Sequence, residues 1–528
     1  MRKFSSYGPV DARFHFSVSR RELVAECAAQ LVNNSGDRGH FFTIWAPRQA
    51  GKTWLMKRAM EEIRSQHGDR FVVGSLLVQG ALDEQDTDEV FFRAVPRLFR
   101  DGFGVEPEAP QHWEGWMRLF SKQGGIFDRP LILLIDEFDT LPAAVIDRLV
   151  STFRAMYLSP QSYVLHGLAL VGVRAVLGVE SPRGPPFNVQ RALRVPNLTR
   201  DEVVDLFDQY QTESAQKVES AVVEQVFNVT RGQPGLVSWF GELVTEKYNA
   251  DPTHPITTAA FNLVYGRACQ VEWNNTILNL IKKARGPYLS HVVSLFTNPN
   301  VPFSLDKDWC NYLHMNGVID EGPPSDNPSS SSVVCRFSSP YVQRRLFAAL
   351  TDDMFGDKAP LLAIEPGDLL ADVFLVGGLA LPPLVERYRG YLKRLKAAGI
   401  DPWVGQPRRA DLHLTEAVGH FHLYAWLRDA VGRRCVISPE FPTGNGKVDL
   451  VLHTEEGHLG LIEVKSFVDM YELQKGQAQA AAYAKKLGVH TVTMVVFVPM
   501  EDERVPASII KGVVVDGVTV QVVAIGWV

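Results

Sequence analysis

The chain has 528 residues, of which 54 are Lys or Arg and 60 are Asp or Glu, and 46% of its side chains are hydrophobic. This is the composition of ordinary folded protein, and it excludes collagen, wholesale disorder and a disulfide miniprotein. At about 150 residues per domain, the length predicts three or four domains. The net charge of −6 argues against a uniformly basic protein that coats nucleic acid, so any such binding must be local.

The cysteine pattern and the apolar runs predict an ordinary cytoplasmic protein. The five cysteines lie far apart and include no Cys-x-x-Cys pair, so neither a disulfide framework nor a zinc site is indicated. No apolar stretch follows the charged N-terminus, so no secretory signal is expected. The longest apolar run, Val373 to Leu384, is well short of the roughly 20 residues that cross a bilayer. We therefore expect no membrane partner.

Residues from about 20 to 250 alternate apolar runs of strand length with longer helical patterns. The predicted strands are 41–45, 71–78, 131–135 and 168–171. This alternation predicts an α/β fold, with a parallel sheet and helices on both of its faces.

A phosphate-binding loop is predicted after the first of these strands, where strand, loop and helix follow in the order that a P-loop needs. Gly51 lets the backbone approach the phosphates, Lys52 reaches the β and γ phosphates, and Thr53 supplies an oxygen to Mg²⁺. The first loop position, normally glycine, is Ala46. The predicted nucleotide-binding residues of the loop are Ala46, Pro47, Arg48, Gln49, Ala50, Gly51, Lys52 and Thr53.

Two adjacent carboxylates end the apolar run 131–135, which is where a P-loop ATPase carries its Walker B pair. Asp136 is expected to hold Mg²⁺ through water, and Glu137 to polarise the water that attacks ATP. The expected cofactors of this part are therefore ATP and Mg²⁺.

These motifs, together with Leu198-Thr199 and Gly232-Gln233-Pro234, resemble the AAA-like ATPases related to the STAND switch family over about residues 15–250. The resemblance implies that Pro234 lies near the nucleotide and that the region behind it moves with nucleotide state. It makes Arg174 a candidate sensor of the γ-phosphate. A surface arginine after a strand is the alternative for Arg174.

The next region, 251–360, predicts helices, a short strand, a Ser-rich loop, a second strand at 333–337 and a helix from Ser339. Within it, Ser304 is expected to cap a helix that ends at Asn316-Gly317. The order of elements resembles a winged helix. Such a domain binds DNA in some proteins and serves as a regulatory or packing module in others, and both alternatives stay open here.

The last region, 361–528, predicts a mixed α/β domain in which three residues form a charged cluster. Asp449 lies on one predicted strand, while Glu463 and Lys465 project from the same face of the next. Burying such charges is costly unless they form a site. Two carboxylates can bind Mg²⁺ or Mn²⁺, and a lysine can orient the attacking water and neutralise phosphate charge.

This cluster resembles the catalytic motif of the PD-(D/E)XK nuclease superfamily. The resemblance implies that Glu416, on the preceding helix, supports the metal, and that Gln479 and Tyr483, on the following helix, lie beside DNA. The proline that the family places before the first Asp is absent, and Val448 stands there. The alternative is a charged edge strand with no site.

Residues 387–409 contain seven basic residues and one acidic residue, with Arg394 and Lys396 among them. This stretch, with Tyr388, Tyr391 and Trp403 between the charges, could bind the phosphate backbone of a nucleic acid. A solvated helix face is the alternative.

The sequence thus predicts three parts: an AAA-like P-loop ATPase (1–250), a winged-helix region (251–360) and a PD-(D/E)XK nuclease-like domain (361–528). The leading hypothesis is an endonuclease that cleaves DNA under control of ATP. The combination resembles ATPase–nuclease fusions of genome defence and mobile elements. The alternative is a nucleotide-dependent switch or scaffold with an inactive nuclease fold. RNA as substrate, a homo-oligomer and a regulatory protein partner stay open.

The metal site sets a condition on strand register. Asp449 can share a metal with Glu463 only if it lies opposite residue 463 or 465 in the antiparallel pair. That requires a loop of three or five residues, or a bulge, between His453 and Leu461. A regular four-residue loop would send the two carboxylates to opposite faces.

Overall fold

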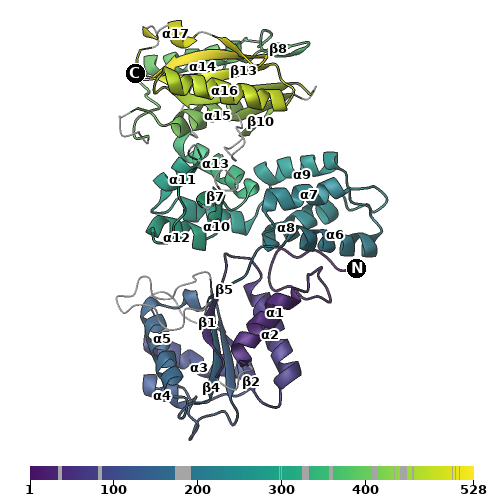
Figure 1. Ribbon diagram of the computed structural model, residues 1–528, viewed down its shortest axis with the longest axis vertical. Coiled ribbons are helices and arrows are strands. Elements are labelled where there is room, and N and C mark those ends of the chain that lie inside the picture. Colours follow the sequence, from purple (N-terminus) through teal and green to yellow (C-terminus); the bar gives the residue numbers. More distant parts are fainter. Residues whose placement is uncertain are drawn as a thin grey trace. The chain divides into compact units, whose positions relative to one another are not determined.

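The computed structural model divides the chain into two compact units, which are described separately (Figure 1). Unit 1 comprises residues 1–276 and 315–317, and unit 2 comprises residues 277–314 and 318–528. The structure describes residues 1–33, 38–80, 86–172, 192–296, 298, 300–323, 332–355, 361–406, 408, 413–432, 434–439, 449–454, 457–501, 504–505, 507–510 and 512–527. The predicted division into three parts at residues 250 and 360 stays a prediction.

Unit 1 is built on a parallel sheet with the strand order β2-β3-β4-β1-β5. The strands are β1 (Phe41–Trp45), β2 (Val72–Leu77), β3 (Leu131–Asp136), β4 (Leu165–Gly172) and β5 (Ala192–Arg194). Every residue of β1 and β3 is buried, because helices cover both faces of the sheet. The predicted parallel α/β fold of this part is confirmed.

Two groups of helices cover the sheet of unit 1. One face carries α1 (Arg21–Val32) and α2 (Lys52–His67), and the other carries α3 (Asp88–Phe103), α4 (Trp113–Arg118) and α5 (Ala143–Leu158) (Figure 1). Because the apolar strands pack between these two layers, their ends are the parts of the sheet that are left for a ligand.

A helical part completes unit 1. It contains α6 (Arg200–Ser214), α7 (Ser220–Thr230), α8 (Pro234–Glu242), a π-helical turn (Leu243–Lys247) and α9 (Thr258–Gln270). Thr199 and Glu202 form a capping box at the start of α6. The ring of Phe4 packs 5.1 Å from that of Phe207, so the N-terminal segment is held against α6.

Unit 2 begins with helices and a short hairpin. They are α10 (Asn275–Ala284), α11 (Leu289–Leu295), α12 (Asp308–Met315), β6 (Ile319–Gly322), β7 (Val334–Phe337) and α13 (Pro340–Phe355). The expected helix from Ser304 starts only at Asp308, so that prediction is wrong at its N-terminal end. The Ser304 hydroxyl accepts the Asp306 N–H at 3.3 Å and forms a local turn instead. Gly317, with φ 78°, follows the end of α12 as predicted.

The second part of unit 2 is a mixed sheet with the order β10-β11-β12-β13-β15-β14. Its strands are β10 (Cys435–Pro439), β11 (Leu450–Thr454), β12 (Leu459–Ser466), β13 (Thr491–Val498), β14 (Val513–Val515) and β15 (Val518–Gly526). Strands β12, β13 and β15 are mutually parallel, and the pairs at both ends of the sheet are antiparallel. Strand β10 was not predicted. The predicted Asp516-Gly517 hairpin is present, with both residues at positive φ.

Helices cover both faces of this sheet as well. One face packs against α14 (Leu381–Ala397) and α15 (Glu416–Val431), and the other packs against α16 (Met470–Lys486) and α17 (Ala507–Ile510). A short hairpin of β8 (Phe374–Leu375) and β9 (Gly378–Leu379) precedes α14. In the described ranges of the chain, no helix is both long and apolar enough to span a bilayer.

Candidate nucleotide and metal sites

The loop between β1 and α2 in unit 1 has the geometry of a phosphate-binding loop. Gly51 adopts φ 92°, a conformation that favours glycine, at the start of α2. The buried Lys52 donates hydrogen bonds from Nζ to the carbonyls of Ala46 (3.0 Å) and Pro47 (3.1 Å), so its ammonium lies inside the loop. Ala46 and Ala50 pack in the core between the sheet and α2, which accommodates the methyl group at the first loop position.

Thr53 and Asp136 meet beside this loop. Thr53 Oγ1 donates to Asp136 Oδ2 at 2.8 Å, and Asp136 is 2% exposed at the end of β3. A hydroxyl and a carboxylate oxygen are hard ligands of the kind that Mg²⁺ takes together with the phosphates of a nucleotide. These two residues therefore fit the Mg²⁺ of a bound ATP.

Glu137 follows Asp136 in the left-handed conformation, with φ 56°. Burial raises the pKa of Glu137, and the neighbouring Lys52 partly opposes this effect. Burial likewise lowers the pKa of Lys52, with Glu137 the main opposing charge. A carboxylate with a raised pKa is a better proton acceptor near neutral pH, which suits a residue that polarises water.

The P-loop also contacts the start of α8, which the sequence linked to the nucleotide only through Pro234. Gln233 Nε2 donates to the Arg48 carbonyl at 3.0 Å, and the Gly235 N–H donates to the Gln49 carbonyl at 3.1 Å. Pro234 is the first residue of α8. Gln233 was missed as a site residue, and its place between glycine and proline was the available signal. Arg174 lies outside the described residues, in the range 173–191.

A small apolar cavity of about 80 Å³ lies next to the P-loop within unit 1. The cavity is lined by residues of the N-terminal segment, the P-loop, α6 and α8, which are distant in sequence. Its lining residues are Val10, Phe16, Ser17, Val18, Arg20, Ala50, Gly51, Trp54, Leu198, Leu206, Pro234 and Ser238. Its lining is mostly apolar and joins the P-loop to the start of α8.

In unit 2, the register of β11 and β12 meets the condition set by the sequence. Leu450 pairs with Ile462 and His453 pairs with Leu459. Thr454 donates its N–H to the His458 carbonyl at 3.1 Å, so three residues of the sequence separate these two partners. Continuing the register by one residue places Asp449 opposite Glu463, on the face that packs against α16.

The four residues of the predicted cluster lie together. Lys465 Nζ is 2.8 Å from Glu463 Oε1 and 3.2 Å from Glu416 Oε1. The Val464 N–H donates to Asp449 Oδ2 at 2.6 Å, and both Asp449 (7% exposed) and Glu463 (4% exposed) are buried. The first residue of α15, Glu416, reaches the cluster from the opposite side of the sheet.

Burial and mutual repulsion act on the two carboxylates of this cluster. Burial raises the pKa of Asp449, and the charge of Glu463 raises it further. Burial also raises the pKa of Glu463, while Lys465 opposes this. Burial lowers the pKa of Lys465, but the neighbouring carboxylates outweigh that effect and raise it overall. The ammonium is therefore held in its charged form between acids.

The donor set of the cluster fits one divalent cation. Glu463 Oε2 is buried and has no hydrogen-bond partner in the described parts of the chain, and the Asp449 carboxylate lies across from it. A group of three or more His, Cys, Asp or Glu side chains arranged to hold a metal is not found among the described residues. Glu416 instead contacts Lys465. Two carboxylates suffice for Mg²⁺ when substrate phosphates and water complete the shell.

Helix α16 covers the cluster with small and polar residues. A Cβ added at Gly476 would lie 3.3 Å from Lys465 Cε, so the helix approaches the lysine closely there. Gln477 is buried on this face, at 7% exposed. Of the two predicted residues, Gln479 is exposed, and Tyr483 is half-buried and packs against the apolar core under α16.

The basic stretch 387–409 is only partly a surface. Tyr388 is fully buried and hydrogen-bonded to His422, and Tyr391 is 6% exposed, so the expectation that these rings contact a phosphate backbone is wrong. Arg394 is paired with Glu365 at 3.1 Å and donates to the Ala363 carbonyl. Lys396 is exposed and lines a cavity.

Comparison with protein families identifies the class of the first half of the chain. Residues 5–263 match the family described as AAA-like domain. With the P-loop and the Thr53–Asp136 pair, this match shows that the chain contains an AAA-like P-loop ATPase domain. The comparison with curated proteins gives no match.

Several solved structures resemble the chain at low identity. The Walker-type ATPase PABY2304 of Pyrococcus abyssi has a TM-score of 0.45 and 15% identity, with 65% of this chain and 99% of that chain covered. Cdc6p from Pyrobaculum aerophilum has a TM-score of 0.37 and 10% identity, with 66% and 98% covered. The RuvB Holliday junction branch migration motor of Thermotoga maritima has a TM-score of 0.33 and 16% identity, with 58% and 90% covered. Similarity at this level does not identify a function.

Proposed function

We propose that the protein is an ATP-hydrolysing enzyme whose C-terminal part cleaves DNA with the help of Mg²⁺, under control of the nucleotide. One observation carries the nuclease half of this proposal. The three-residue loop of the β11–β12 hairpin puts Asp449 opposite Glu463, with Lys465 two residues further on the same face. Burying charged side chains is costly, and a charged edge strand without a site would keep them in solvent.

In the ATPase part, each residue acts on a different part of the nucleotide. Lys52 binds the β and γ phosphates, Thr53 and Asp136 hold the Mg²⁺, and Glu137 accepts a proton from the attacking water. The contacts of Gln233 and Gly235 with the P-loop link phosphate binding to the position of α8. We propose that this link is the element that responds to nucleotide state.

In the C-terminal part, Asp449 and Glu463 would hold a divalent cation, which stabilises charge on the scissile phosphate and lowers the pKa of bound water. Lys465 orients the attacking water and neutralises charge that develops on the phosphate. Glu416 keeps the Lys465 ammonium in place through the 3.2 Å contact. The side chain of Glu416 thereby acts on the reaction through Lys465.

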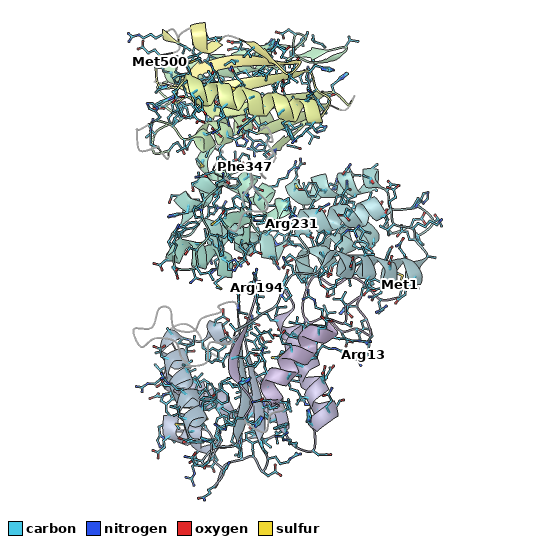
Figure 2. The ribbon with its side chains drawn as sticks, viewed as in Figure 1. Met1, Arg13, Arg194, Arg231, Phe347 and Met500 are labelled. Atoms are coloured by element: carbon cyan, nitrogen blue, oxygen red, sulfur yellow. The ribbon has the colours of Figure 1, made fainter. Side chains whose placement is uncertain are left out.

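We further propose that the segment from α10 to α13 is a winged-helix module that acts on the nuclease-like part by direct packing. Phe347 of α13, labelled in Figure 2, stacks on Phe421 of α15 with ring centroids 4.3 Å apart. The same ring lies 4.8 Å from His420, one turn after Glu416. A movement of α13 would therefore reach the helix that carries Glu416.

The proposal is tested by incubating plasmid DNA with the purified protein and Mg²⁺ or Mn²⁺, with and without ATP. We expect nicking that disappears with Asp449→Asn and persists with Glu472→Gln, an exposed carboxylate on α16. Absence of Mg²⁺-dependent nicking in the unchanged protein, under every nucleotide condition, would contradict it. Mn²⁺ as cofactor, RNA as substrate, a homo-oligomer, genome defence and a cytoplasmic location stay predictions.

A second function is favoured by one specific observation. Lys465 already lies between Glu463 and Glu416, so the cluster is neutralised in part without a metal. A nucleotide-dependent switch that binds DNA or a partner through an inactive nuclease fold would keep this arrangement. Such a protein would bind DNA in the plasmid experiment without nicking it, and its DNA affinity would change with ATP.

A further inference from the structure

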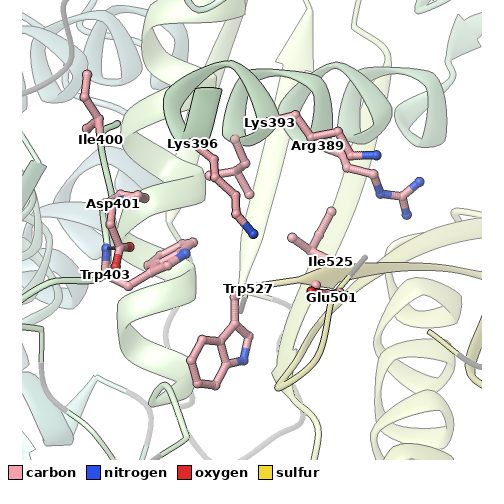
Figure 3. Close-up of a pocket in the computed structure, with 12 residues that line it drawn as sticks. Arg389, Lys393, Lys396, Ile400, Asp401, Trp403, Glu501, Ile525 and Trp527 are labelled. Carbon is pink, nitrogen blue, oxygen red and sulfur yellow. Dashed lines mark hydrogen bonds between the residues drawn. The ribbon is translucent and has the colours of Figure 1, made fainter. Parts of the chain in front are cut away.

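Unit 2 contains a cavity of about 400 Å³ between α14 and the end of β15 (Figure 3). Its volume lies within the range of small-ligand sites. Its lining combines basic, aromatic and acidic side chains. The lining residues are Arg389, Leu392, Lys393, Lys396, Ile400, Asp401, Pro402, Trp403, Glu501, Ile525, Gly526 and Trp527.

Three basic residues of α14 form one wall of the cavity. Arg389, Lys393 and Lys396 are spaced by four and three residues, which places them on one side of the helix. Arg389 is held by hydrogen bonds to the Ala524 carbonyl and to Glu386. Lys393 and Lys396 are exposed, and Figure 3 shows the Lys396 ammonium extending from the helix toward Trp527.

Two tryptophans supply apolar surface to the same cavity. Trp403 is 5% exposed and packs against His422, with ring centroids 4.9 Å apart. The Arg408 guanidinium lies 4.8 Å from the Trp527 ring centroid, and Arg408 does not line the cavity. This contact therefore fixes the Trp527 ring without filling the space. Trp527 Nε1 is a buried donor with no partner in the described parts of the chain.

The cavity lies near the carboxyl end of β15 and the carboxylate cluster near that of the parallel strand β12, on opposite faces of the sheet, since α14 lines the cavity and α16 covers Lys465. Lys465 is aligned with Val496 on β13, which is aligned with Ala524 on β15. Two strand spacings separate Lys465 from Ala524, or about 10 Å. Trp527 lies just beyond the carboxyl end of β15, so a single nucleic-acid strand that passes round this edge from one face of the sheet to the other can reach both places.

We propose that this cavity binds one phosphorylated nucleoside, with its base against the half-buried ring of Trp527 and its phosphate on Lys393 and Lys396. Aromatic faces bind bases of any sequence, and lysines bind the phosphate as point charges. Asp401 and Glu501 supply acceptors for base N–H groups and lower the attraction for simple anions. The inference deepens the proposed function, since it names the surface that holds the substrate strand.

The nucleoside unit can come from single-stranded DNA or from a free nucleotide, and one binding experiment distinguishes them. The probe is a fluorescein-labelled oligothymidylate of about ten nucleotides, a length within the site sizes of single-strand binders. Anisotropy is measured in EDTA, so that no cleavage occurs. Competitors are thymidine 5′-monophosphate, thymidine and inorganic phosphate. Thymine is used because the P-loop part is expected to take adenine nucleotides.

The test variant carries Lys393→Ala with Lys396→Ala, and the control carries Lys57→Ala with Lys217→Ala, two exposed lysines of unit 1. We expect the test variant to bind the probe about tenfold more weakly, with a slope of log affinity against log salt that is smaller by about 1.4. The control is expected to keep the affinity and slope of the unchanged protein. Equal affinities for all three proteins would overturn the inference.

The competitors show whether the site takes a free nucleotide or only a nucleic-acid strand, and whether the base is in contact. Displacement of the probe by thymidine 5′-monophosphate supports a site that also takes free nucleotides, and displacement only by unlabelled oligonucleotide supports a site for a strand. If inorganic phosphate competes as well as the monophosphate, the base makes no contact and the inference is wrong. Asp449→Asn separates this result from the proposed function, because it should bind the probe normally whether or not the unchanged protein cleaves DNA.

Discussion

Asp449 stands opposite Glu463 across the antiparallel pair of β11 and β12, on the face that packs against α16. Both carboxylates are buried, and the charge of Glu463 raises the pKa of Asp449 further. A divalent cation bound between them would relieve that repulsion, because it would pair with both charges at once. The relationship depends on loop length alone, since one more residue in the loop would turn Asp449 to the opposite face.

Replacing Glu463 by Gln should therefore weaken divalent-cation binding. One of the two carboxylates is lost while the side-chain size is kept, so we expect affinity for Mg²⁺ or Mn²⁺ to fall more than about tenfold. Isothermal titration calorimetry with each metal gives this directly. The thermal unfolding midpoint should not fall, because the variant removes a buried charge of raised pKa. Unchanged metal affinity would show that the cation, if any, binds elsewhere.

The hairpin illustrates how far the sequence determines the site. Strand positions and the charged residues were predictable, because alternation and burial cost are local properties. The choice among a three-, four- or five-residue loop was left open, because Glu455 and Glu456 are compatible with each. Gly457, which adopts φ 86°, is the residue that closes a three-residue loop, and it was the available signal.

The expectation for Tyr388 and Tyr391 was wrong because it considered the charges of residues 387–409 and not their helical spacing. Leu384, Tyr388, Tyr391 and Leu395 recur at helical spacing, which predicts a buried face of α14, and all four are buried. The contacts of Gln233 with the P-loop join residues 185 and 184 positions apart, so its place between glycine and proline marks Gln233 but does not indicate its partners. The motifs thus predicted the nucleotide-binding residues. The contact between the P-loop and α8 is visible only in the tertiary structure.

The P-loop assignment predicts different effects for two variants. Lys52→Ala should abolish tight ATP binding, because the ammonium that lies inside the loop would bind the phosphates in the ground state. Glu137→Gln should keep ATP binding and reduce turnover about 100-fold or more, because it removes only the proton acceptor. Fluorescent-nucleotide binding and phosphate release distinguish the two. Normal turnover in either variant would refute the role given to that residue.

The contact between α8 and the P-loop predicts a variant that changes coupling. Gln233→Ala removes the 3.0 Å hydrogen bond to the Arg48 carbonyl and the cap that Gln233 provides to α8. We expect ATP to bind, with the effect of ATP on DNA cleavage reduced. Gln211→Ala, at a half-buried glutamine in α6, serves as control. If ATP changes cleavage equally in all three proteins, α8 does not transmit nucleotide state.

Stability of unit 2 should depend on pH through His422. Burial lowers the pKa of this histidine from an ordinary 6.5 to about 3. The unfolded chain therefore binds a proton that the folded chain rejects, and stability present above pH 6.5 is lost as the pH falls toward 3, by up to about 1.4 kcal/mol per pH unit. Urea unfolding between pH 7 and 4 should show a smaller pH slope for His422→Phe than for the unchanged protein. Identical slopes would contradict this.

Gly476 offers a test of the lysine that leaves the carboxylates in place. A Cβ there would lie 3.3 Å from Lys465 Cε and 3.5 Å from Met494 Cε, so the branched side chain of Gly476→Val must push the lysine aside. The ammonium would then lose its contacts with Glu463 and Glu416, and we expect DNA cleavage to fall about tenfold or more while metal affinity and ATP turnover stay unchanged. Ala478→Val, at an exposed position of the same helix, controls for the effect of a β-branched residue on α16. Wild-type cleavage by Gly476→Val would mean that the position of Lys465 does not limit the reaction, and it would favour the switch over the nuclease.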